Sequence, residues 1–274
     1  RQRQMCIRDS IFIGLFLRWE LHRARNGRDA LLDLSLFKVG TFSWGNLTAA
    51  TVAIGEFSLM FVLPLFLVNS MGLSTLTTGV VLAGMALGAF ASGAQARHLA
   101  ARLTAPGVVV LGLALEVIGV AALAWVVAVQ ASVWLVVATL VVYGVGLGLA
   151  SAQLTSTVLG DIPEELSGAG SATQSTVRQL GSALGAAIAG SALGVAMART
   201  IPATGVPAEL AQATESSAGS AITALRETAG ASAEIISSLE AGFAQSAAWS
   251  IGFSALFLVL GLVGSFMVLR ASRR

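Results

Sequence analysis

Six long stretches that almost lack charged residues constrain this 274-residue chain more than any other feature. Each has close to the roughly 20 apolar residues that an α-helix needs to cross a bilayer. Their hydrophobicity does not alternate as it does in the strands of a membrane barrel. The six stretches are residues 46–68, 77–95, 107–129, 132–154, 180–198 and 248–269. The sequence therefore predicts an all-α fold, a polytopic membrane helix bundle with six transmembrane helices.

Composition excludes several classes of function. Hydrophobic residues make up 55% of the chain and charged residues 11%, which is unlike a water-soluble enzyme or a disordered protein. The net charge of +2 gives no basic face for nucleic acid. The single cysteine, Cys6, excludes a disulfide or a cysteine-based metal site within the chain. His22 and His98 both fall in loops, so we expect no metal site, and no nucleophilic triad or phosphate-binding loop is present.

Basic residues orient the six spans. Eleven fall in segments that alternate to one side of the membrane: Arg18, Arg23, Arg25, Arg28, Lys38, Arg97, Arg102, Arg178, Arg270, Arg273 and Arg274. Only Arg199 and Arg226 fall on the other side. Because cytoplasmic loops carry the excess of Lys and Arg, we expect the C-terminus in the cytoplasm. The membrane that we expect to hold the chain is the plasma membrane of a bacterial cell.

The chain divides into five segments. Residues 1–10 resemble the translation of a sequencing adaptor, although a genuine charged tail or the start of a signal peptide is the alternative. Residues 11–39 then hold the end of a truncated helix, because the apolar run 11–17 is too short to span, and a cytoplasmic linker. Residues 40–199 carry the first five full helices, 200–246 an extracytoplasmic loop, and 247–274 the last helix and tail. In the loop, residues 208–218 and 221–239 suggest short amphipathic helices in a solvated connector, with a lid or a partner surface as alternatives.

Two acidic residues stand inside spans. Glu56 lies near the middle of the first span, and Glu116 lies nine residues into the third. An ionised Asp at such depth costs about 2.5–3.5 kcal/mol on insertion scales, and the predicted spans hold no basic residue to offset it. Each carboxyl should therefore be protonated, face a wet cavity, or exchange between these states as a proton carrier does; a permanently protonated, hydrogen-bonded Glu is the alternative. Gly112 and Gly119 share a helical face with Glu116, so this acid should point into the bundle.

Other polar and small residues are weaker candidates. Gln153 and Gln174 could line a cavity or bond helix ends, and Arg178 could anchor the start of the fifth span. Glycines at four-residue spacing allow close helix packing, or helices that slide during transport. These pairs are Gly84 and Gly88, Gly144 and Gly148, Gly181 and Gly185, and Gly190 and Gly194.

Several strings, in order along nearly the whole chain, resemble the C-terminal half of fourteen-helix drug:proton antiporters of the major facilitator superfamily. The strings occupy residues 16–21, 31–37, 41–43, 61–67, 72–79, 144–148, 161–165, 168–173 and 176–185. The last of them, Thr-Val-Arg-Gln-Leu-Gly-Ser-Ala-Leu-Gly, is the most specific. The second loop departs from the family's Gly-x-x-x-Asp-Arg-x-Gly pattern and keeps only Arg102, which argues against a gate there. Arg102 and, in the fourth loop, Arg178 are nevertheless the candidates for a cytoplasmic gate.

The resemblance implies proton-coupled efflux of hydrophobic or cationic drugs by alternating access. The partners would be a small-molecule substrate, protons, the lipid bilayer and a missing N-terminal half. The proton motive force would replace any cofactor. The alternatives are a permease for another metabolite or a siderophore, or a non-transporting membrane scaffold or permease subunit.

Overall fold

Helices make up nearly all of the computed structural model, which describes residues 18–19, 34–228 and 232–272. Six helices are long and apolar enough to cross a membrane, which confirms the predicted bundle. They are α2 (Gly40–Asn69), α3 (Thr75–Leu103), α4 (Ala105–Ala128), α5 (Val133–Leu159), α6 (Ser167–Thr200) and α9 (Ala233–Ala271). The shorter elements are η1 (Leu34–Lys38), η2 (Glu164–Leu166), η3 (Pro202–Thr204), α7 (Ala208–Ser216) and α8 (Ser220–Glu227). The expectations for residues 1–17 lie outside the described residues.

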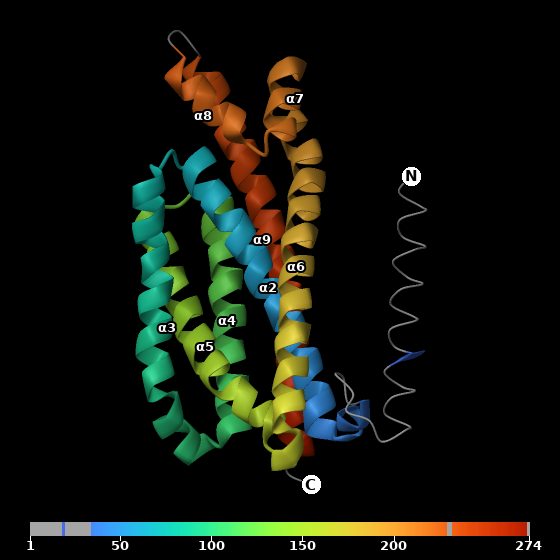
Figure 1. Cartoon of the computed structure of the whole chain (residues 1–274). Helices are drawn as coiled ribbons and strands as arrows, with labels where there is room; N and C mark the ends of the chain where they lie inside the picture. Colours follow the sequence, from blue (N-terminus) through green and yellow to red (C-terminus); the bar gives the residue numbers. More distant parts are fainter. Residues whose placement is uncertain (1–17, 20–33, 229–231, 273–274) are drawn as a thin grey trace.

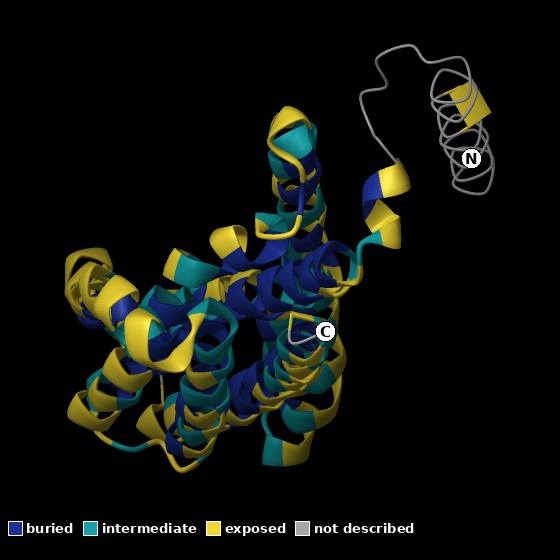
Figure 2. Ribbon diagram, turned by 90° about the horizontal axis from the view of Figure 1, so that it is seen from below, coloured by how far each residue is buried: buried dark blue, intermediate teal, exposed yellow. Residues whose placement is uncertain are grey.

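The long helices pack side by side in one bundle (Figure 1). Helix α2 packs against both α9 and α6, which also contact each other, while α4 joins α9 to α5, and α5 packs against α3. We call the end that holds α7 and α8 the upper end, and the end that holds the C-terminus the lower end. Viewed from below, buried residues occupy the middle of the bundle and exposed residues its outside (Figure 2).

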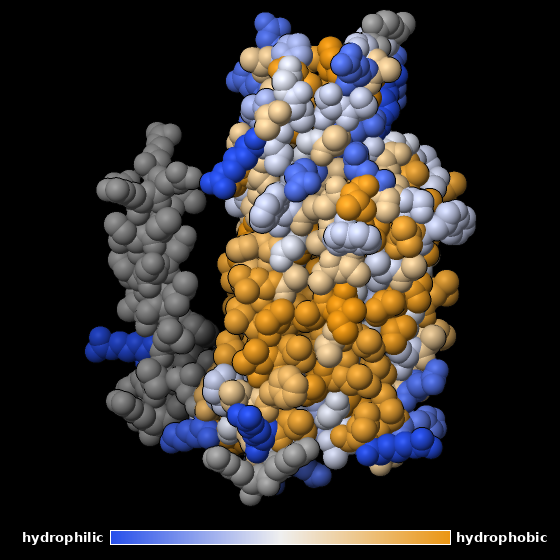
Figure 3. All heavy atoms as spheres, turned by 180° about the vertical axis from the view of Figure 1, so that it is seen from behind, coloured by the Kyte–Doolittle hydropathy of each residue, from blue (hydrophilic) through white to orange (hydrophobic). Residues whose placement is uncertain are grey.

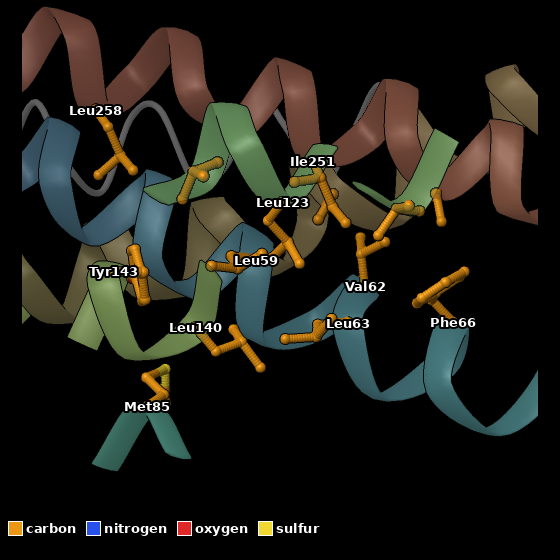
Figure 4. Packing of buried hydrophobic residues seen from close by; sticks show 14 of the residues in the cluster. Leu59, Val62, Leu63, Phe66, Met85, Leu123, Leu140, Tyr143, Ile251 and Leu258 are labelled. Carbon is orange, nitrogen blue, oxygen red and sulfur yellow. The ribbon is translucent and has the colours of Figure 1, made fainter. Parts of the chain in front are cut away.

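Aliphatic side chains from four helices fill the core. Leu59 of α2, Leu123 of α4, Leu140 of α5 and Ile251 of α9 are fully buried and lie close together (Figure 4). The outside is apolar too: one whole face carries a hydrophobic band with more polar residues above and below it (Figure 3). A soluble protein would bury such a band, so this surface fits a lipid environment.

Two helices begin several turns earlier than hydropathy predicts. Helix α6 begins at Ser167 rather than residue 180, and α9 begins at Ala233 rather than residue 248. The added turns are rich in Ser, Thr, Ala and Glu, which hydropathy does not count as part of a span. Their inner faces are nevertheless packed, with Gly170 and Thr173 buried in α6 and Leu239 and Phe243 buried in α9.

Three of the predicted glycine pairs lie where helices touch backbone to backbone, between α3 and α5 and between α6 and α2. Between α3 and α5, a Cβ on Gly88 would lie 2.7 Å from the Val141 carbonyl oxygen, while Gly144 and Gly148 approach the backbone of α3 even more closely and Gly84 faces Val137. Between α6 and α2, a Cβ on Gly181 would lie 2.8 Å from the Ala50 oxygen, and one on Gly185 would lie 2.5 Å from the Ile54 oxygen. Close packing of this kind supplies the dispersion contacts that hold membrane helices together.

The last predicted glycine pair does not pack in this way. A Cβ on Gly194 would meet nothing within 4 Å, and one on Gly190 would meet only the Phe61 ring at 3.7 Å. Among the described residues, therefore, neither glycine serves a backbone contact between helices. The four-residue spacing cannot distinguish a packed face from an open one, because both kinds of face repeat with the helical period.

The segment above the bundle is packed rather than a solvated connector. Helix α7 matches the first amphipathic helix expected there, but the second is split: α8 ends at Glu227 and the rest joins α9. Ile222 of α8 and Phe243 of α9 are fully buried, and Gly219 at the start of α8 lies against the Phe243 ring. Two short amphipathic helices can bury apolar faces against the ends of longer helices, which periodicity alone does not reveal. We call residues 202–228 the upper cap.

One arginine ties the upper cap to the bundle. The Arg226 guanidinium donates to the carbonyl oxygens of Val68, Asn69 and Ser70 at the end of α2, over 3.3, 2.7 and 3.0 Å. It also pairs with the Glu240 carboxylate of α9, with a shortest N–O distance of 2.7 Å. These bonds satisfy carbonyl groups that the end of α2 leaves without helical partners, so the cap joins α2, α8 and α9.

Two further features concern α2. At the lower end, the Thr41 hydroxyl donates to the Asp161 carboxylate over 2.8 Å, which links the start of α2 to the turn between α5 and α6. Within the helix stands Pro64. Proline has no N–H, so the carbonyl of Met60 loses its usual helical partner.

Candidate functional site

Glu56 and Arg178 meet at the interface of α2 and α6. Glu56 is buried in α2, and its Oε2 lies 3.8 Å from the Arg178 guanidinium, whose side chain keeps 36% of its surface exposed. This distance allows an ion pair but exceeds that of a hydrogen bond. The pair therefore links a buried carboxylate to a cation that still reaches the surface of the bundle.

The close approach of α6 to α2 makes this pairing possible. Gly181 and Gly185 let the two backbones touch just above Arg178, and the Ser58 hydroxyl donates to the Gly185 carbonyl over 2.9 Å. Arg178 sits one turn below Gly181 on α6, so its long side chain can extend along α2 to Glu56. A larger residue at either glycine would widen the gap that the guanidinium has to cross.

Glu116 is the second carboxyl of the site. It is fully buried in α4, as its neighbouring glycines predicted. A Cβ on Gly146 of α5 would lie 2.9 Å from the Glu116 Cγ, so the side chain packs against a backbone without a side chain of its own. Neither carboxyl oxygen of Glu116 has a hydrogen-bond partner among the described residues.

The three groups lie in the same part of the core. Glu116 makes no ion pair with Arg178 among the described residues, but Glu56 and Arg178 are near enough for their charges to act on it. We call Glu56, Glu116 and Arg178 the charged cluster. It contains one cation and two carboxyl groups inside an apolar bundle, where charge is poorly screened and costly to leave unbalanced.

Tyr143 is a buried polar side chain near Glu116 that the sequence analysis missed. It lies in α5, one turn before Gly146, which packs against the Glu116 side chain. Gly119 of α4 makes room for it, because a Cβ there would lie 2.8 Å from the Tyr143 Cβ. The available signal was its uniqueness: Tyr143 is the chain's only tyrosine and stands inside an apolar span.

Gln174 lies one turn below Arg178 on the same helix. It is buried, and its Nε2 has no hydrogen-bond partner among the described residues. The Oδ1 of Asn46 on the facing helix α2 is buried and unpartnered as well. Buried polar atoms of this kind are usually paired with protein or water, so the lower approach to the charged cluster is polar rather than apolar.

The remaining sequence candidates lie away from the charged cluster. Gln153 lines a hollow of about 370 Å³ between α3 and α5 together with Arg97 and His98. Arg102 lines a neighbouring groove of about 600 Å³ with Gln95 and Leu149. The structure thus brings Glu56, Glu116 and Arg178 together and leaves these two residues apart.

The position of Arg178 corrects one expectation. Because α6 begins at Ser167, Arg178 lies well inside a helix instead of anchoring the start of a span. Glu56 therefore has a basic partner, contrary to the expectation from sequence. Arg178 still lies in the lower part of α6, so the excess of basic residues toward the lower end remains.

The described residues hold no group of three or more His, Cys, Asp or Glu side chains that could bind a metal ion. The chemistry that the charged cluster can perform is the exchange of protons and ion-pair partners. A proton on either carboxyl would change which acid Arg178 balances.

Comparison with known proteins identifies the family. The sequence profile of the Major Facilitator Superfamily matches residues 11–186. The chain belongs to the Major Facilitator Superfamily. This is a family of transporters rather than enzymes, as the absence of a catalytic motif predicted, and the chain is a multi-pass membrane protein with bacterial relatives.

Individual relatives are distant. MdtD of Pectobacterium carotovorum, named for multidrug resistance, is 32% identical over 187 residues, which cover 68% of this chain and 40% of MdtD. The multidrug efflux pump LfrA of Mycolicibacterium smegmatis is 28% identical over 84% of this chain and 45% of LfrA. The riboflavin transporter RibZ of Clostridioides difficile is 28% identical over 58% of this chain and 34% of RibZ. The chain thus spans less than half the length of these relatives.

Proposed function

We propose that this chain forms the C-terminal half of a drug exporter that works by alternating access and is driven by inward proton flow. The family match and the two relatives named for multidrug resistance or efflux support the drug-export part. The observation that carries the coupling part is the charged cluster, in which Arg178 pairs with the buried Glu56 and a second buried carboxyl, Glu116, lies within range of both charges.

The charged cluster can couple protons to movement for an electrostatic reason. With both carboxyls ionised, one guanidinium leaves a net negative charge in a medium of low dielectric constant. One proton neutralises the cluster, and a change in water access from one side of the membrane to the other would load or release it. The substrate cavity would lie between this half and the part of the transporter that the chain does not include.

The lower end would face the cytoplasm of a bacterial cell. Arg97, Arg102 and Arg270 lie at that end, whereas only Arg199 and Arg226 lie toward the upper end of the described residues. The positive-inside rule supports this orientation and a cytoplasmic C-terminus.

The Glu56→Gln substitution in the gene's complete product tests this proposal. We expect dye efflux driven by a pH gradient in membrane vesicles to fall at least tenfold, because a neutral amide cannot release a proton. Glu165→Gln, which makes the same change at an exposed turn, should leave efflux unchanged. Unaltered, pH-dependent efflux by the Glu56→Gln protein would remove Glu56 from the coupling mechanism.

The likeness to RibZ favours one second candidate, a permease for a metabolite. Transport of riboflavin and of a cationic dye by the same vesicles separates the two functions. Riboflavin transport without dye efflux would favour the metabolite permease, and dye efflux alone would favour the drug exporter.

A further inference from the structure

A groove runs along the outside of the bundle between the upper halves of α6 and α9. Its volume is about 750 Å³, and none of the residues of the charged cluster lines it. On α6 its wall is made of small side chains, among them Ala187, Ser191 and Ala192, which leave the helix surface hollow. On α9 the opposite wall is made by Trp249 and Phe253, one turn apart.

The groove is held open by the contacts at its ends and floor. At the top, the Thr200 hydroxyl bonds to the Gly242 carbonyl over 3.0 Å and to the Ser246 hydroxyl. Lower down, the Ser250 hydroxyl donates to the Ala189 carbonyl over 3.4 Å. These bonds fix α6 against α9 behind the groove, so its shape does not depend on an occupant.

Tryptophans place the upper boundary of the membrane at the top of this groove. Leu123 of α4 and Ile251 of α9 pack against each other in the core (Figure 4). Trp125 lies two residues above Leu123 on α4, and Trp249 lies two residues above Ile251 on α9. Trp134 stands at the upper start of α5. All three tryptophans are exposed, by 65%, 66% and 78%, and exposed tryptophans at one level are typical of the interface between lipid tails and headgroups.

Arg199 lies just above this level and closes the top of the groove. It neighbours Thr200, whose partner Ser246 is one turn above Trp249. Arg199 is exposed, and no acidic side chain among the described residues pairs with it. From Ala187 to Arg199 the groove follows twelve residues of helix, about 18 Å at 1.5 Å per residue. This length matches the roughly 15 Å of hydrocarbon in one leaflet.

We propose that this groove binds an anionic phospholipid of the leaflet at the upper end. Its phosphate lies on the Arg199 guanidinium, whose planar fork suits bidentate binding of phosphate. One acyl chain lies along the small residues of α6 and against the Trp249 and Phe253 rings. The site is independent of the transported solute and of the charged cluster.

Lipid retention measured by native mass spectrometry tests this site. The gene's complete product, purified in detergent, is mixed with phosphatidylglycerol or with phosphatidylcholine at equal concentrations. We expect one phosphatidylglycerol to be retained at least fivefold more than phosphatidylcholine. Arg199→Gln should abolish this preference, while the control Arg97→Gln, which removes an exposed arginine at the lower end, should keep it.

A second variant tests the acyl-chain part of the groove while keeping the charge. Ala192→Phe fills the groove, and we expect it to lower retention of phosphatidylglycerol even though Arg199 remains. Equal retention of the two lipids by the unsubstituted protein would overturn the proposal, as would an Arg199→Gln protein that keeps the preference. The proposal also fails if Ala192→Phe weakens dye binding while lipid retention is unchanged, because the groove would then hold the transported solute.

Discussion

The two arginine–glutamate pairs of this bundle differ in how completely the arginine is satisfied. Arg226 at the upper end binds three backbone carbonyls and reaches Glu240 at 2.7 Å. Arg178 within the bundle reaches Glu56 only at 3.8 Å, and its side chain donates no hydrogen bond to the other described residues. A second buried acid, Glu116, lies within range of the inner pair.

This difference separates a structural pair from one that can change partners. Replacing Arg226 would leave several backbone carbonyls without a hydrogen-bond donor, so the intact upper pair stabilises the folded state. The inner pair is long, and neither carboxyl oxygen of Glu116 has a hydrogen-bond partner among the described residues. Such an arrangement is a poor way to stabilise a fold and a suitable one for exchanging a proton.

The largest expected effect comes from removing the inner arginine. Arg178→Gln should lower proton-driven dye efflux at least tenfold and lower the stability of the protein by about 2 kcal/mol, because the buried Glu56 carboxylate loses its ion-pair partner. The double variant Glu56→Gln/Arg178→Gln should regain most of the thermal stability in detergent while efflux stays low. Arg97→Gln serves as the exposed control. If the double variant transports normally, the inner pair is as structural as the upper one.

A smaller effect on transport, with a clear effect on stability, is expected at the upper end. Arg226→Gln removes charged hydrogen bonds to α2 and the ion pair with Glu240, which should cost about 3 kcal/mol. For a chain of this size that corresponds to a fall of roughly 5–10 °C in melting temperature. The proton dependence of efflux per folded molecule should not change. A shifted proton dependence with normal melting would reverse the roles assigned to the two pairs.

The smallest effect tests whether helix packing sets the length of the inner pair. Gly185→Ala places a methyl group against the Ile54 carbonyl oxygen, which should push α6 from α2 and cost about 1–2 kcal/mol. We also expect efflux to fall severalfold, because Arg178 then lies farther from Glu56. Gly194→Ala, which meets nothing within 4 Å, should be neutral in both melting and transport. Equal behaviour of the two variants would show that the close approach is not needed.

The sequence predicted those features that depend on single residues in a lipid environment. The six spans and the two intramembrane acids follow from the free energy of transferring each side chain from water to lipid, which does not depend on contacts between helices. The burial of Glu116 followed from glycines on its own helical face.

Features that depend on contacts between helices escaped the sequence analysis. The pairing of Arg178 with Glu56 requires that α6 begin at Ser167 and touch α2 at Gly185. Both positions lie more than a hundred residues after Glu56 in the sequence. The role of Arg226 depends on the upper cap folding back onto the end of α2. Tyr143 of α5 packs into the space that Gly119 of α4 leaves, which is also a contact between two helices.

Pro64 gives α2 a weak point between these two regions. Above it, the helix end is clamped by Arg226, and below it stands Glu56. Because the Met60 carbonyl already lacks its helical partner, bending α2 here breaks fewer backbone hydrogen bonds than bending it elsewhere. Bending at Pro64 would move the lower part of α2, which carries the Glu56 carboxylate, while the upper end stays bound to Arg226.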